Sequence, residues 1–267
     1  LAVFTLPPEM IHFYKKHILY ITENAIKPDQ RRYGPAGDEE APRHYIDIDA
    51  HVYGDSAIYK MPKKWDDAVA KYSEDTLQAY GIVPWHIEKM YKRLVWAFRN
   101  KDVKSILKNS AEIGHYIGDG NVPLHTTENY NGQLTGQKGI HGFWESRLPE
   151  LLSDDFDFFV GRAEYVDDPL QRAWDGVTRA HFAMDSVLKF ERQLTKKFGD
   201  DKKYSFETRG NATTQVYSKE FSNAFNEMLD FQVERQMRHS IKMVGDFWYS
   251  AWVDAGQPDL DALAGYK

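Results

Sequence analysis

The chain has 267 residues, with 34 Lys and Arg against 40 Asp and Glu, so its formal net charge is −6 when histidines are neutral. Hydrophobic and charged contents of 42% and 28% exclude a disordered chain, a collagen and a coiled-coil rod, and the absence of cysteine excludes disulfides and thiolate metal sites. The longest apolar runs, such as Leu94 to Phe98, are far shorter than the roughly 20 residues that span a bilayer, so we expect a soluble protein.

Helical periodicity predominates from the start of the chain, and no sustained alternating strand pattern is found. A first helix is predicted from Thr5 to about Ala25, because prolines occupy its first turn. Residues 26–62 are rich in proline and glycine. This composition predicts a long functional loop that carries something other than core.

The rest of the chain is predicted as a series of helices. Asp102 is the expected cap of a helix in which Ile106, Ile113 and Ile117 form part of one apolar stripe. The other helices are expected at 64–79, from 83 to about 98, near 141–148, at about 167–199 and at about 217–256. We therefore predict an all-α fold, a multi-helix bundle in which residues 1–267 form a single domain.

Histidines and carboxylates recur at helical spacing in the middle of the chain. His115 and Asp119 are four residues apart and lie away from the apolar stripe of their helix. Taken alone, such a pair is more often a solvated one. His125 follows six residues later, and His141 and Glu145 repeat the four-residue spacing on another helix. Together these residues predict a metal site.

Imidazole and carboxylate are the ligands that suit Zn²⁺ when no thiolate exists. The set of His125, His141 and Glu145 is of the catalytic type, in which two histidines and one carboxylate leave a coordination position for water or substrate. His115 and Asp119 need further ligands from elsewhere in the chain.

The segment His115-Tyr-Ile-Gly-Asp119-Gly-Asn-Val-Pro-Leu-His125, followed by His141-Gly-Phe-Trp-Glu145, resembles the core motif of a known superfamily. It is that of the zinc-dependent phospholipases C and the single-strand-specific nucleases of fungal and plant type, and the chain looks like a bacterial member. The resemblance implies an all-α fold and a cluster of three zinc ions that cleaves phosphate esters. It also implies two ligand sets, one of Asp29, His44, His115 and Asp119, and one of His125, His141 and Glu145.

The third zinc of the family is bound by an N-terminal Trp, a His a few residues later and the carboxylate that Asp119 matches. This chain starts at Leu1, so we expect roughly a dozen residues upstream that carry the Trp and the His. We therefore expect two zinc sites in this chain and a third when those residues are present. Because family members are exported, the resemblance also implies a periplasmic or secreted protein.

The resemblance gives further residues roles on the substrate. Asp29 would orient or deprotonate the attacking water and Arg32 would bind the phosphate. Tyr45 would stack on a nucleic-acid base and Asp47 would hydrogen-bond it, although ordinary packing is the alternative for Tyr45. These residues favour the nuclease branch, whereas Glu145 in place of Asp favours the phospholipase branch.

We therefore expect a zinc-dependent phosphodiester hydrolase, a single-strand nuclease or 3′-nucleotidase that acts on single-stranded nucleic acid or nucleotides. The alternative is a phospholipase C that acts on phospholipid head groups. A second alternative is a helical protein that binds metal or nucleotide without turnover. No protein partner and no transmembrane segment are indicated by the sequence.

Overall fold

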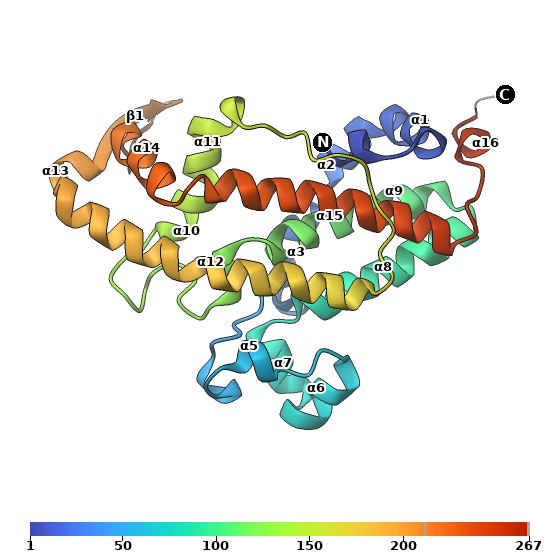
Figure 1. Ribbon diagram of the computed structural model, residues 1–267, viewed down its shortest axis with the longest axis horizontal. Helices are drawn as coiled ribbons and strands as arrows, with labels where there is room; N and C mark the ends of the chain where they lie inside the picture. Colours follow the sequence, from blue (N-terminus) through green and yellow to red (C-terminus); the bar gives the residue numbers. More distant parts are fainter. Residues whose placement is uncertain (211, 266–267) are drawn as a thin grey trace.

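The computed structural model describes residues 1–210 and 212–265, and it is mainly helical, as predicted. Its long helices are α8 (Val83–Arg99), α9 (Val103–Gly120), α12 (Pro169–Phe198) and α15 (Gln232–Asp254). Figure 1 shows α12 and α15 lying along the long axis of the molecule, and both pack on α8 and α9. The predicted cap is confirmed, because Asp102 accepts a hydrogen bond from the Ser105 amide at the start of α9.

Shorter helices surround this framework. They are α1 (Pro8–Lys16), α2 (Ile18–Asn24), α3 (Lys27–Arg32), α4 (Gly37–Glu40), α5 (Ala57–Lys60), α6 (Trp65–Tyr72), α7 (Glu74–Tyr80), α10 (Ile140–Gly142), α11 (Leu148–Leu152), α13 (Asp200–Lys203), α14 (Lys219–Met228) and α16 (Leu260–Ala264). Helices α5, α6 and α7 form a group on one side of the long helices (Figure 1). No helix in the described part of the chain is long and apolar enough to cross a membrane.

Three helices that the periodicity predicts as continuous are interrupted in the structure. The first is broken at His17, where α1 ends and packs on α16 while α2 packs on α9. The second is broken at Ser73, whose φ of 69° ends α6 and whose hydroxyl caps α7. The third is broken at Phe231, with φ of 55°, between α14 and α15. In each case the apolar period continues across the break, so periodicity alone does not reveal it.

The prediction for residues 26–62 is wrong in one respect. The segment is not a loop free of core, because it forms α3, α4, α5 and two 3₁₀ turns, Ala41–His44 and His51–Tyr53. Between those turns, Ile46 and Ile48 are fully buried. The extended backbone there alternates inward and outward side chains, and the Ile46 amide donates to the His125 carbonyl at 2.9 Å. The segment is thereby fixed against the part of the chain that follows α9.

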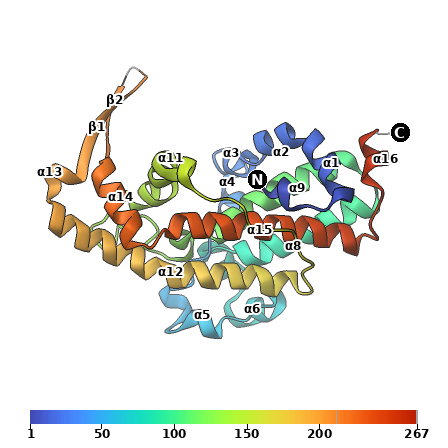
Figure 2. The same cartoon turned by 45° about the horizontal axis from the view of Figure 1, so that its top comes forward.

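The structure also contains two strands, which the sequence pattern does not predict. Strands β1 (Tyr204–Arg209) and β2 (Ala212–Tyr217) form an antiparallel hairpin in which Tyr204 lies opposite Tyr217. Figure 2 shows the hairpin projecting from the helices near α13 and α14. Because most of its side chains are exposed, the hairpin lacks the alternating apolar pattern by which strands are recognised.

Two clusters of buried apolar side chains make up the core. The larger lies among α1, α8, α9 and α15, and the smaller includes Phe143, Phe221 and Phe225. Residues next to the predicted metal ligands belong to both clusters, since Ile117 is in the larger and Leu124 is in the smaller. The candidate site is therefore built from both parts of the core. The division of the chain into domains stays a prediction.

Candidate metal centre

Three predicted ligands from separate segments meet in a first donor group. Asp29 lies on α3, His44 ends the 3₁₀ turn after α4, and His115 lies on α9. The Nδ1 of His44 is 3.1 Å from the Nε2 of His115. One carboxylate oxygen of Asp29 is 3.6 Å from each of these nitrogens. The three donor atoms converge closely enough to hold a metal ion.

Asp119 lies one helical turn after His115 and faces the same point. Its Oδ2 is 2.9 Å from the Nδ1 of His44 and 3.3 Å from the Nε2 of His115. Its other oxygen, Oδ1, is 3.6 Å from the Nδ1 of His125. Asp119 therefore lies beside the two histidines as a further donor. We call Asp29, His44, His115 and Asp119 together the first donor group. The Asp119 carboxylate also lies between that group and His125.

His125, His141 and Glu145 form the second donor group. The Nε2 atoms of the two histidines are 3.2 Å apart, and the Oε2 of Glu145 is 2.8 Å from His141 and 3.7 Å from His125. Glu145 lies in a π-helical turn, Phe143–Arg147, that joins α10 to α11. Such turns are found often at functional sites, because the widened turn changes the direction of its side chains.

Backbone carbonyl groups fix the orientation of both rings in the second donor group. His125 donates its Nδ1–H to the carbonyl of His44 at 2.8 Å, and His141 donates its Nδ1–H to the carbonyl of Tyr130 at 3.1 Å. A carbonyl oxygen only accepts, so the proton of each neutral ring is on Nδ1 and the Nε2 lone pair is directed at the group. This is the arrangement found around metal-binding histidines.

The first donor group is supported from behind by buried side chains. The Oε1 of Glu40, a residue only 1% exposed, lies 3.5 Å from the Nε2 of His44. Burial raises the pKa of Glu40, but hydrogen bonds from Tyr116 and Arg31 outweigh it and hold the pKa at about 2. Glu40 is therefore ionised and places a buried negative charge beside the Nε2 of His44, which makes no hydrogen bond. Nothing in the sequence singles out Glu40, because it is one of several acidic residues in the segment 26–62.

One histidine in each group, His115 in the first and His125 in the second, has a raised pKa. Burial lowers the pKa of His115, but Asp119 and Asp29 outweigh it and raise the pKa to about 10. Burial also lowers the pKa of His125, but Asp119 and Glu145 outweigh it and raise the pKa to about 9. The same contacts lower the pKa of Asp119 and Glu145 despite their burial. A cation bound here would replace the protons on the two histidines.

The carbonyl that orients His141 belongs to a loop that is tied to α12. The side-chain amide of Gln137 is buried and donates to the Oε2 of Glu191 at 2.5 Å and to the carbonyl of Leu188 at 2.7 Å. The other oxygen of Glu191 pairs with Lys203 at 2.6 Å. No sequence pattern pointed to Gln137 or Glu191, because they are 54 residues apart and on different elements.

The predicted phosphate ligand, Arg32, is exposed on α3 and is paired with no carboxylate in the described part of the chain. The adjacent Arg31 differs, since its guanidinium lies 3.2 Å from Glu40 and 2.7 Å from Glu112. Arg31 therefore supports the structure behind His44, whereas the donors of Arg32 are open to a ligand.

The predicted base-binding residues follow His44 directly. Tyr45 is half-buried, and burial and the nearby Asp47 carboxylate raise its pKa. Asp47 is anchored by its backbone amide to the carbonyl of Tyr80. Burial, with the nearby carboxylates of Asp49 and Glu128, raises the pKa of Asp47 to about 7. The Asp47 carboxyl group can therefore both donate and accept hydrogen bonds near neutral pH.

Comparison with known proteins leaves the family open. No family model and no solved structure matches the chain. A curated protein of Bradyrhizobium tropiciagri, described as a probable serine protease, is 25% identical over 118 residues. The match covers 34% of this chain and only 15% of that protein. Such partial similarity does not transfer an activity to this chain.

Proposed function

We propose that the protein is a zinc-dependent phosphoric ester hydrolase, and that its two donor groups bind zinc next to each other. The observation that carries this proposal is the spacing of the donor atoms. Zinc–nitrogen bonds of roughly 2.0–2.1 Å in tetrahedral directions place neighbouring donors about 3.4 Å apart. In the first group the donor atoms of Asp29, His44 and His115 are 3.1 to 3.6 Å apart, and Asp119 lies 2.9 and 3.3 Å from the two histidines. The donors of the second group are 2.8 to 3.7 Å apart. Both groups fit zinc.

The donor chemistry supports the same proposal. Four imidazoles and three carboxylates, with no thiolate in the chain, are a set that zinc accepts. The second group supplies only three donors, and Glu145 has a side chain 38% exposed, so water or a substrate oxygen can complete the coordination. A purely structural zinc site would instead have four protein ligands and be closed to solvent.

When bound, the zinc ions would supply a water of lowered pKa and positive charge for the phosphate oxygens. Asp29 has a side chain 47% exposed, so its second oxygen can orient that water and accept its proton. The guanidinium of Arg32 offers paired N–H donors to a phosphate and has no competing carboxylate in the described chain. Asp119 lies between the groups, with one carboxylate oxygen 2.9 Å from His44 and the other 3.6 Å from His125.

We propose single-stranded nucleic acid or a nucleotide as the substrate, with nuclease or 3′-nucleotidase activity. Tyr45 directly follows a zinc ligand, and its half-exposed ring can stack on any base. Asp47, two residues further on, can exchange hydrogen bonds with a base edge because its pKa is near 7. We also propose that the chain has the fold type of the phospholipase C and nuclease superfamily and that it is exported from the cell.

A specific observation favours the alternative, a phospholipase C. The loop that orients His141 carries Leu134, 70% exposed, and Tyr130, 53% exposed. Apolar side chains at the edge of a catalytic site can enter a lipid surface. Binding of metal or nucleotide without turnover is the second alternative. A serine protease is less well supported, because in the described residues no serine hydroxyl hydrogen-bonds to a histidine ring.

Hydrolysis assays on zinc-loaded protein test the proposal, with single-stranded DNA, a 3′-nucleotide and phosphatidylcholine as substrates. His141→Ala should lose about one zinc per chain and lower turnover at least about 100-fold. Removing this ligand removes the zinc of the second group, and with it the coordination position that is open to water or substrate. His12→Ala is the matched control, since His12 is exposed and lies beside Asp261.

Arg32→Ala should lower kcat about 100-fold with the zinc content unchanged, because only a donor to the phosphate is removed. Arg32→Lys should recover part of that loss, since the charge is kept without the paired donors. Faster cleavage of phosphatidylcholine than of DNA would reverse the ranking of substrates. Zinc binding without hydrolysis of any of the three would support the second alternative.

A further inference from the structure

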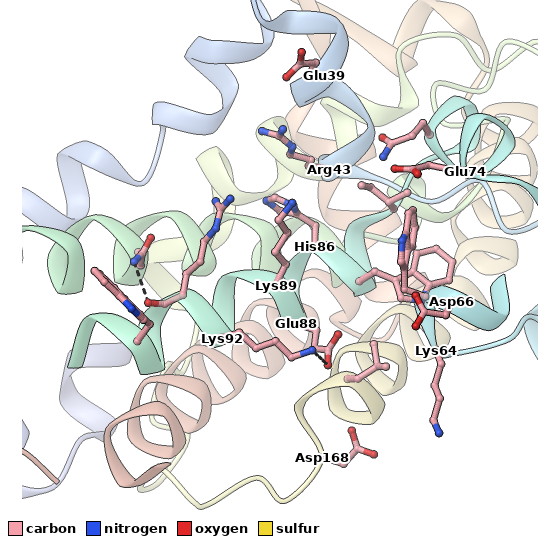
Figure 3. Close-up of a pocket in the computed structure, with 18 of the residues that line it drawn as sticks. Glu39, Arg43, Lys64, Asp66, Glu74, His86, Glu88, Lys89, Lys92 and Asp168 are labelled. Atoms are coloured by element: carbon pink, nitrogen blue, oxygen red, sulfur yellow. Dashed lines mark hydrogen bonds and ion pairs between the residues drawn. The ribbon is translucent and has the colours of Figure 1, made fainter. Parts of the chain in front are cut away.

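A large cavity lies outside the donor groups. It has a volume of about 1510 Å³ and follows α8 between the 3₁₀ turn after α4, helices α6 and α7, and the start of α12 (Figure 3). We call it the α8 groove. None of the seven proposed zinc ligands lines it, so the cavity needs an explanation of its own.

One face of α8 forms the floor of the groove and carries cations beside an aromatic ring. Lys89, Lys92, Arg93 and Trp96 are spaced at three and four residues, so they lie on the same face, and all four are exposed. Lys92 pairs with Glu88 at 2.6 Å. Lys89 and Arg93 have no carboxylate partner in the described chain, and the indole of Trp96 is 58% exposed.

A buried histidine at the same part of the groove lacks a partner. His86 is only 4% exposed, and its Nε2 has no hydrogen-bond partner in the structure. Burial and the charge of Arg43 lower the pKa of His86 to about 3, and Lys89 and Arg93 act in the same direction. Figure 3 places Arg43, His86 and Lys89 in the central part of the lining. His86 is therefore an uncharged hydrogen-bonding group with cationic side chains near it.

Negative charge is found at the other end of the groove. Asp66, Glu74 and Asp168 line it where α6, α7 and α12 approach, in the part of Figure 3 that is away from Arg43. Asp38 and Glu39 lie on the wall formed by α4. These carboxylates repel phosphate, so an anionic ligand is restricted to the part of the floor between Arg43 and Trp96.

The cationic part of the groove adjoins the first donor group. The ring of Tyr116 lies 4.4 Å from that of His86 on one side and 5.4 Å from that of His44 on the other, centroid to centroid. Arg43 directly precedes His44 and pairs with Glu40, the acceptor behind it. The groove and the first donor group therefore lie on the two sides of one buried tyrosine ring.

We propose that the floor of the α8 groove, from Arg43 to Trp96, is a second subsite for single-stranded nucleic acid. Backbone phosphates would lie on Lys89 and Arg93, and a base would stack on the indole of Trp96. Cations interleaved with an exposed aromatic ring are what such strands bind in proteins that do not read sequence. This inference rests on the proposed function, because it gives a longer strand a binding site beyond the reacting phosphate.

Binding of a labelled, phosphorothioate-linked oligothymidylate of about twelve nucleotides to the zinc-loaded full chain tests the subsite. Trp96→Ala should weaken binding about five- to 150-fold, the range for loss of one base stack. The double variant Lys89→Ala/Arg93→Ala should reduce the slope of log K against log salt by about 1.4, since two phosphate contacts are lost. Phe206→Ala and Lys197→Ala are the exposed controls and should bind like the wild-type chain.

Two further arms separate the possible ligands. Thymidine monophosphate should bind with little dependence on these variants, whereas equal losses for the mononucleotide would mean a nucleotide site and overturn the strand subsite. Binding of phosphatidylglycerol vesicles through Trp96 would overturn it as well. Zinc content checks that the donor groups are intact. If no substrate is hydrolysed but the oligonucleotide still needs Lys89, Arg93 and Trp96, the subsite stands while the proposed hydrolase fails.

Discussion

The two donor groups are oriented by different means. In the first, the far nitrogen of His44 faces Glu40, a buried carboxylate that is held by Arg31 and Tyr116. In the second, the far nitrogens of His125 and His141 donate to backbone carbonyl groups. The first group is therefore oriented by ionised side chains in the interior, and the second by the course of the main chain.

The difference predicts which substitutions each group tolerates. A buried carboxylate is a single side chain, and its loss leaves both a ring and a cation without their partner. A backbone carbonyl cannot be removed by substitution, so the second group responds only when the supporting loop shifts. The first group should thus depend on one residue, whereas the second should depend on several contacts that each contribute less.

The largest effect is expected from Glu40→Gln. Loss of the carboxylate behind His44 should weaken metal binding at the first group by roughly 10- to 100-fold and leave the second group unchanged. Competition with a chromophoric chelator measures the two affinities. Glu39→Gln is the matched control, because Glu39 is the exposed neighbour of Glu40. Equal weakening of both groups would show that they are not independently supported.

The second-largest difference between the two donor groups is expected in the pH dependence of their metal binding. His115 has a pKa of about 10 and His125 of about 9 without a cation, so both hold protons at neutral pH. A metal ion must displace these protons, so the apparent affinity should rise up to about tenfold per pH unit for each proton released. The rise should stop near pH 9 for the second group and near pH 10 for the first. Titrations from pH 6 to 10 would contradict this if affinity were constant.

A smaller effect is expected from Gln137→Leu. The substitution removes the amide that ties the loop to Glu191, but the Asn131 side chain still accepts hydrogen bonds from Gly139 and His141 in that loop. Metal affinity at the second group should fall by less than about tenfold, below the range for direct partners of a ligand. Gln193→Leu, exposed on α12, is the control. A loss as large as that of Glu40→Gln would remove the contrast between the groups.

Much of the candidate site follows from local spacing. A separation of four residues on a helix places His115 beside Asp119 and His141 near Glu145 whatever the rest of the fold does. Asp29 and His44 were assigned only through a resemblance, since nothing local joins α3 to α9. The structure brings their donor atoms to the same point, yet the resemblance to a hydrolase family itself stays a proposal.

The sequence alone determined that the chain is mainly helical and that His115 lies beside Asp119 and His141 beside Glu145, because both follow from residue type and short-range period. Only the tertiary structure decided where α1, α6 and α14 end, since packing against other helices overrides a continuous apolar pattern. It also decided that Glu40 and Gln137 support the donor groups. Burial and long-range hydrogen bonds give these residues their roles, and neither is encoded by neighbours in the chain.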